Sequence, residues 1–209
     1  MKKTIFIVMA LVIVFAAFST QAQAITWTPT FDSTLSGFAT AGQVQAVTSH
    51  TLYPEGSVVT APFGGYMAKL TSYGYDTPAP GTNGSIMLDG MSFNAGDPVQ
   101  FMWLFDAGDY LPFNDFAIYF QDAIGPGYME FLLSNVSATG NYGNTGWQLF
   151  DYTFTSSFIG DIGWMCSNYG DTALNSYLLV ASVPEPGTLL LLGSGLVGLA
   201  FFARRRKQA

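Results

Sequence analysis

Residues 147–155 read WQLFDYTFT, and their side chains alternate between two faces. Phe150, Tyr152 and Phe154 fall on one face. Gln148 shares that face, whereas Asp151 and two threonines fall on the other. A period of two is the pattern that a half-buried β-strand requires. This stretch therefore predicts a strand with an aromatic inner face.

Similar short runs fill the rest of the chain between its two ends. Residues 99–105 read VQFMWLF, an almost continuous apolar run that predicts a central strand covered on both faces. The other predicted strands are residues 25–31, 44–48, 57–61, 66–72, 85–88, 116–121, 128–134 and 177–181. Turn-forming segments rich in Gly, Pro, Asn and Asp separate these runs. The sequence therefore predicts an all-β domain, an antiparallel β-sandwich or jelly roll, over residues 25–182.

The first 24 residues have the layout of a signal peptide. Lys2 and Lys3 precede an apolar run at residues 5–18, and Ala22 and Ala24 frame a cleavage site of small residues. The apolar run is too short for a comfortable membrane span. We therefore predict cleavage after Ala24, with an uncleaved signal anchor as the alternative.

The C-terminus has three consecutive parts. A Pro-Glu-Pro motif comes first, at Val183, Pro184, Glu185 and Pro186. An apolar run follows at residues 188–203 and would span about 24 Å as a helix, against about 30 Å for a bilayer core. The last part is a basic cluster, Arg204, Arg205, Arg206 and Lys207, which predicts that this end stays in the cytoplasm. The order predicts a single, weakly held transmembrane helix.

This order of motif, helix and basic cluster resembles the PEP-CTERM sorting signals of bacterial surface proteins. The resemblance implies that residues 183–207 form the sorting signal and that an exosortase reads the Pro-Glu-Pro element and removes the helix. It also implies delivery by the general secretion machinery and transient anchoring in the inner membrane. The remaining domain would then pass to the cell envelope, the cell surface or an exopolysaccharide matrix. A simple tail anchor is the alternative.

Charge is distributed very unevenly between the ends and the domain. The chain has a net charge of -7, but six of its seven Lys and Arg residues lie in the two end segments. Residues 25–182 keep only Lys69 against thirteen acidic side chains, a net charge of about -12. Binding to nucleic acid or to an anionic membrane needs clustered basic residues, so both are excluded for this domain. Binding of a divalent cation is compatible with this charge.

One segment gathers oxygen-bearing side chains. They are Asp106, Asp109, Asn114 and Asp115. Calcium prefers about six to eight oxygen ligands, so this segment would supply part of a calcium site. Asp161, Asn168 or Asp171 could donate from another loop. The alternative, which we favour, is that these side chains cap turns through hydrogen bonds to the backbone.

The same segment carries a second resemblance. Residues 109–117 read DYLPFNDFA, residues 146–148 read GWQ, and residues 171–180 read DTALNSYLLV. These elements resemble ones that occur together in β-sandwich domains of bacterial surface proteins. The resemblance implies a fold and no particular ligand. The aspartate that usually follows the last strand of such domains is replaced here by Ala181 and Ser182.

The residue inventory argues against an enzyme. Cys166 is the only cysteine, which excludes an internal disulfide, and its apolar neighbours predict a small buried side chain. His50, the only histidine, lies 116 residues away in sequence. No nucleophile elbow or phosphate-binding loop occurs. A secreted hydrolase, the least favoured class, would need two carboxylates about 5–9 Å apart.

Aromatic residues suggest a further kind of site. The tryptophans Trp27, Trp103, Trp147 and Trp164 are predicted to pack in the core. The tyrosines in turn-rich contexts are predicted to lie at the surface, where they could contact sugar rings: Tyr73, Tyr75, Tyr110 and Tyr142. We therefore expect an exported, non-enzymatic structural or adhesive protein. A carbohydrate-binding module, or a calcium-dependent adhesion module, is the alternative.

Overall fold

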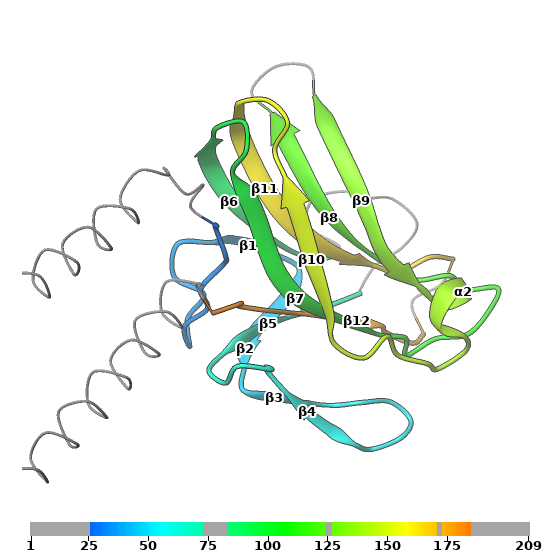
Figure 1. Ribbon diagram of the computed structural model, residues 1–209. Helices are drawn as coiled ribbons and strands as arrows, with labels where there is room; N and C mark the ends of the chain where they lie inside the picture. The colour runs from blue at the N-terminus through cyan, green and yellow to red at the C-terminus, as the bar shows by residue number, and fades with distance from the viewer. Residues whose placement is uncertain (1–25, 73–82, 124–126, 171–172, 185–209) are drawn as a thin grey trace, which may run out of the picture.

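The computed structural model describes residues 26–72, 83–123, 127–170 and 173–184 (Figure 1). The predicted signal peptide and C-terminal helix lie outside these ranges. Within them, no helix combines the length and the apolar character needed to cross a membrane. The elements of the described chain are β1 (Ala39–Ala41), β2 (Gln43–Val47), β3 (Ser49–Thr51), β4 (Val58–Thr60), β5 (Met67–Thr71), β6 (Gly84–Phe93), β7 (Pro98–Asp106), β8 (Phe116–Ala123), β9 (Tyr128–Asn135), α2 (Val136–Thr139), β10 (Gln148–Thr153), β11 (Phe158–Ser167) and β12 (Tyr177–Ala181).

Two five-stranded sheets pack face to face (Figure 1). The first sheet has the order β1-β6-β11-β8-β9, and the second has the order β10-β7-β12-β5-β2. All the paired strands in both sheets are antiparallel. The predicted antiparallel β-sandwich is therefore confirmed.

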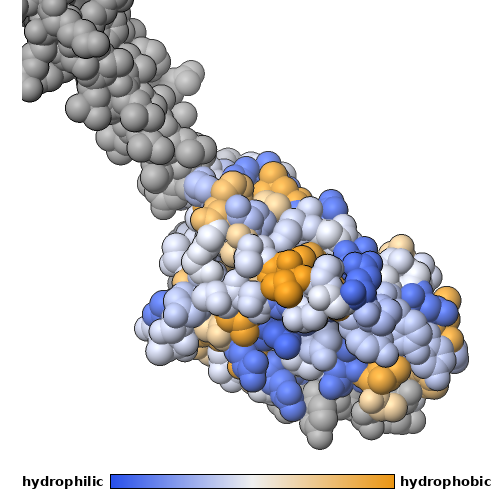
Figure 2. Space-filling view, turned by 90° about the horizontal axis from the view of Figure 1, so that it is seen from below, coloured by the Kyte–Doolittle hydropathy of each residue, from blue (hydrophilic) through white to orange (hydrophobic). Residues whose placement is uncertain are grey.

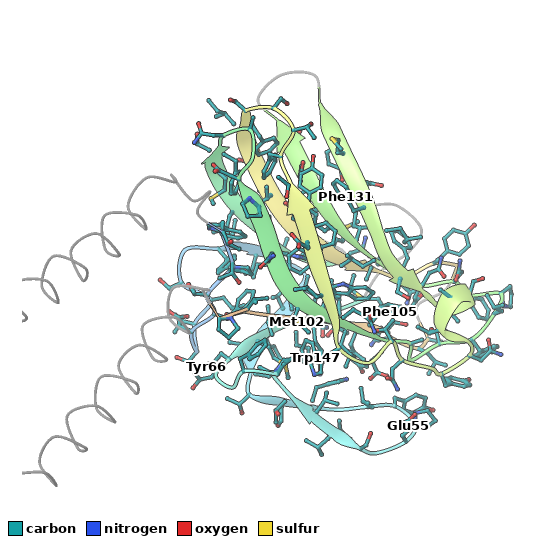
Figure 3. The ribbon with its side chains drawn as sticks, viewed as in Figure 1. Glu55, Tyr66, Met102, Phe105, Phe131 and Trp147 are labelled. Atoms are coloured by element: carbon teal, nitrogen blue, oxygen red, sulfur yellow. The ribbon has the colours of Figure 1, made fainter. Side chains whose placement is uncertain are left out.

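An aromatic core joins the two sheets. The Phe101 ring of the second sheet lies 5.3 Å from Tyr119 and 5.2 Å from Trp164 of the first, measured between ring centroids. Phe150 stacks on Phe101 at 4.6 Å, and Phe131 approaches Phe150 at 5.7 Å (Figure 3). Because alternate side chains of β10 point inward, the aromatic face predicted from residues 147–155 is the one that the core uses.

A second, smaller core covers the outer face of the second sheet. The β3–β4 hairpin lies over this face (Figure 1). Leu52 and Ala61 from the hairpin region pack with Met67, Leu104 and Leu179 from the sheet. Met102 and Trp147, labelled in Figure 3, pack against this cluster. Strand β7 is therefore covered on both faces, as its apolar run predicted.

Three strands were not predicted, and one predicted strand is absent. Strands β1, β3 and β11 were missed, and residues 26–31 form no strand beyond a single bridge between Trp27 and Val99. Strand β11 pairs on both sides, but its glycines hide the apolar alternation. At Gly163 a Cβ atom would collide with the Phe120 ring and the Ile86 carbonyl oxygen. Close packing therefore requires glycine at position 163, although glycine in a sequence argues against a strand.

Candidate functional site

Asp115, one of the predicted calcium ligands, is a buried structural residue. Its carboxylate accepts hydrogen bonds from the Ser72 hydroxyl at 3.0 Å and from the Tyr169 amide at 3.0 Å. Burial raises the pKa of this carboxyl to about 6, against the opposing effect of these hydrogen bonds. Because Ser72 follows β5 and Tyr169 follows β11, Asp115 ties the two sheets together at this end of the sandwich.

The side chains of Asp109 and Asn114 also accept hydrogen bonds from backbone amides. Asp109 Oδ1 accepts from the Tyr110 amide at 2.7 Å, and Asn114 Oδ1 accepts from the Ser137 amide at 2.8 Å, in the first turn of α2. These are the turn and cap roles that we weighed against calcium.

The second-loop donors predicted for calcium are dispersed. Asp161 accepts from the Gly90 amide at 2.8 Å within the first sheet, and the Asn168 amide group donates to the Leu174 carbonyl at 3.0 Å. Asp171 lies outside the described residues. Across the described ranges no three or more His, Cys, Asp or Glu side chains gather in a way that would hold a metal. Calcium binding stays a prediction.

Asp106 has a different environment, which the sequence did not reveal. One of its oxygens, Oδ2, lies 2.8 Å from His50 Nε2 and accepts a hydrogen bond from the Tyr53 amide at 3.2 Å. Both side chains of the Asp106–His50 pair are buried. The pair joins β7 to the β3–β4 hairpin, so it fastens the hairpin onto the outer face of the sheet.

A cavity of about 440 Å³ opens beside this pair. We call it the His50 pocket; its principal lining residues are Ser49, His50, Tyr53, Lys69 and Tyr177. The Lys69 ammonium nitrogen lies 4.5 Å from the centroid of the Tyr177 ring, and the His50 ring lies 4.9 Å from the same ring. Burial lowers the pKa of Lys69, and the negative charge of Asp106 acts against this shift.

Three tyrosines from separate loops form a row next to the pocket. We call Tyr53, Tyr110 and Tyr142 the tyrosine strip. The Tyr142 ring lies 5.6 Å from Tyr53 and 5.7 Å from Tyr110, between centroids. Tyr53 is 47% exposed and Tyr110 is 38% exposed. Since Tyr53 also lines the His50 pocket, the strip and the pocket are adjacent.

Hydrogen bonds between the loops hold the strip in place. Tyr142 has a positive φ of 56°, and its amide donates to the Asp109 carbonyl at 2.9 Å. The Asn144 side chain donates to Glu55 Oε1 at 3.5 Å and so joins the 141–146 loop to the hairpin loop; Glu55 is labelled in Figure 3. Surface positions for Tyr110 and Tyr142 were predicted, whereas Tyr53 was missed. Tyr73 and Tyr75 lie outside the described residues.

Cys166 has the buried position that the sequence predicted. Its side chain is fully buried, and its sulfur donates to the Ser176 carbonyl at 3.5 Å. Burial raises the pKa of the thiol well above its ordinary value. The four tryptophans also pack as predicted: Trp164 is fully buried, and Trp27, Trp103 and Trp147 pack against one of the two cores.

Comparison with known proteins places the chain in a class of exported proteins. The family model of the PEP-CTERM protein-sorting motif matches residues 182–207. The chain therefore carries a PEP-CTERM motif, and it is an exported, envelope-associated protein sorted at its C-terminus and processed by an exosortase. A comparison with curated proteins found no match.

Two solved β-rich domains are similar in overall structure. One is the C-terminal family 22 carbohydrate-binding module of Clostridium thermocellum Xyn10B, with 12% identity and a TM-score of 0.39, covering 80% of this chain and 98% of that chain. The other is the K3 cleaved adhesin domain of Lys-gingipain from Porphyromonas gingivalis, with 14% identity and a TM-score of 0.37, covering 71% of this chain and 93% of that chain.

Proposed function

We propose that residues 25–182 form a non-enzymatic adhesive protein of the cell envelope or extracellular matrix, and that it binds polysaccharide at the tyrosine strip and the His50 pocket. The observation that carries this proposal is the row formed by Tyr53, Tyr142 and Tyr110, which come from three separate loops. Tyrosine offers a flat apolar face with a polar tip, a combination that suits a sugar ring with its hydroxyl groups. A concave site with a few placed polar groups beside such faces is typical of a binding site.

The backbone of Tyr142 supports this proposal. A bulky residue at positive φ costs about 1–3 kcal/mol and persists only where the surroundings impose it. Here the strained backbone conformation places the Tyr142 ring between the other two rings of the strip. Such strained positions cluster at functional sites, and the conformation of Tyr142 is consistent with a binding role. Leu35 has the same conformation in the core, so positive φ alone does not mark a binding residue.

The surrounding surface favours a polar ligand. Figure 2 views the molecule from below, the side on which the β3–β4 hairpin lies in Figure 1, and shows a face of mostly intermediate hydropathy with hydrophilic areas and small separate apolar patches. A surface that buries itself against an apolar partner usually presents one large contiguous patch. A hydroxyl-rich polymer suits this face better.

Substitution within the strip tests the proposal. We expect Tyr142→Ala and Tyr110→Ala to weaken binding of the full chain to the exopolysaccharide of the producing cells about tenfold, because each removes a stacking face. Affinity electrophoresis in gels containing that polysaccharide measures the effect. Tyr66→Ala is the matched control, since Tyr66 is also 38% exposed but lies elsewhere on the molecule (Figure 3).

Two results would contradict the proposal: no retardation of the unmodified chain, or equal loss of retardation in Tyr66→Ala. We also expect binding to survive a calcium chelator, because the carboxylates of Asp109 and Asp115 accept hydrogen bonds from the protein. Loss of binding on chelation would instead support a calcium-dependent adhesion module.

A further inference from the structure

We infer that the His50 pocket takes a neutral, hydroxyl-rich sugar unit and discriminates against acidic sugars. This inference rests on the proposed polysaccharide binding and names the class of ligand.

The fixed charges of the pocket cancel one another. Lys69 is the only Lys or Arg in the described ranges, and it lies in the field of the Asp106 carboxylate. Asp106 sits behind the pocket wall, bonded to His50 and to the Tyr53 amide. With His50 counted as neutral, as in the net charge of the chain, the site pairs one cation, Lys69, with one anion, Asp106, and has no surplus positive charge to offer a carboxylate.

The binding of an acidic sugar at such a site would include an unfavourable free energy that no other interaction offsets. A carboxylate loses hydration on entering, and the nearby Asp106 carboxylate opposes its attraction to Lys69. The thirteen acidic side chains of residues 25–182 add a long-range repulsion that only salt screens. A neutral hydroxyl group meets neither penalty.

The hydrogen-bonding groups of the pocket match hydroxyl groups. An ammonium group only donates, whereas the hydroxyls of Ser49 and Tyr53 both donate and accept. A sugar hydroxyl is both donor and acceptor, and it can satisfy either kind of group.

The position of Tyr53 links the pocket to a polymer. Its ring is exposed at the rim of the pocket and contacts Tyr142 of the strip. A polysaccharide lying along the strip would therefore carry one unit into the pocket and continue over the neighbouring tyrosines. The pocket would select the type of unit, and the strip would add area that tolerates different sugars.

The experiment compares neutral with acidic polymers on the full chain in detergent. The neutral probes are dextran, xylan and mannan, and the acidic probes are alginate and polygalacturonate, each tested at low and high salt. We expect retention by at least one neutral polymer with little salt dependence, and no retention by the acidic polymers at low salt. This comparison needs no variant, so it does not depend on the folding of one.

A variant then assigns the selectivity to the pocket. Lys69→Met removes the ammonium group and keeps an apolar stem, so we expect about tenfold weaker binding to the neutral polymer, as for loss of a charge-assisted hydrogen bond. Gln45→Met is the control, because Gln45 lies directly opposite Lys69 on β2 and does not line the pocket.

The outcomes separate the two proposals. Tighter binding of an acidic polymer, lost in Lys69→Met, would overturn the inference and leave the proposed function standing. Equal binding of neutral polymer by Lys69→Met and the unmodified chain would also overturn it. If no polymer and no native exopolysaccharide binds, the proposed function itself fails.

Discussion

Asp115 is the residue at which burial and charge conflict most clearly. It accepts hydrogen bonds from Ser72 and Tyr169, which follow strands of different sheets. Burial nevertheless raises its pKa from an ordinary value of 3.8 to about 6. The folded protein thus holds this proton more tightly than the unfolded chain. Its contribution to stability is complete below the unfolded pKa and is lost as the pH rises through the folded pKa.

We expect the free energy of unfolding to fall by about 3 kcal/mol from this group between about pH 4 and pH 7, given a shift of about two pKa units. Urea unfolding at a series of pH values measures the slope. Asp115→Asn should flatten it, whatever that variant does to stability at a single pH. Asp151→Asn removes an equal charge from an exposed position and should leave the slope in place. An unchanged slope in Asp115→Asn would contradict the assignment.

At the scale of the element, the β3–β4 hairpin creates the site. It covers the second sheet with Leu52 and Ala61, and it brings His50 and Tyr53 to Asp106. Without this docking the pocket would have no wall on the hairpin side. The stability of the hairpin and the integrity of the pocket are therefore coupled.

We expect His50→Ala to destabilise the protein by about 2 kcal/mol or more, because it leaves the buried Asp106 carboxylate without its side-chain partner. Combining it with Asp106→Ala should add less than the sum of the two single losses, with a coupling of about 1 kcal/mol or more. Denaturant unfolding of the two single variants and the double variant measures this coupling, and limited proteolysis of the hairpin loop reports its release. Strict additivity would show that the pair does not fasten the hairpin.

Strand prediction succeeded where an apolar run or an alternating pattern is strong, and it missed β11, where packing demands glycine. Strand β7 has an almost continuous apolar run and β10 has a clear alternation, and both strands were predicted. Strand β11 was missed, although it lies between β6 and β8, because Gly163 is required by the Phe120 ring and the Ile86 carbonyl. The reason for that glycine lies in neighbouring strands and not in the local sequence.

In the whole molecule, an acidic β-sandwich is followed by the C-terminal motif that sorts the exported protein. The PEP-CTERM motif at residues 182–207 contains Glu185 between its two prolines. Four of the seven basic residues lie within the same motif. Removal of the motif would therefore leave a domain that is almost free of positive charge.

We expect Glu185→Ala to prevent processing, because it removes the acidic side chain of the Pro-Glu-Pro element, which we propose the exosortase recognises. The full-length form should then accumulate in the membrane fraction, as immunoblotting of membrane and released fractions would show. Glu130→Ala removes an acidic side chain from β9 and should leave processing normal. Normal release of the Glu185→Ala protein would contradict this role.

The sequence alone was sufficient for the features that local patterns encode. Strand alternation and the linear order of the sorting motif each depend on neighbouring residues, so the antiparallel sandwich and the sorted C-terminus could be predicted. The turn positions of Tyr110 and Tyr142 were equally readable. The site could be recognised only in the folded protein, because the Asp106–His50 pair joins residues 56 positions apart, and Tyr53 meets Tyr142 through the docking of a hairpin onto a sheet. Such contacts depend on how buried faces fit together, which no local pattern records.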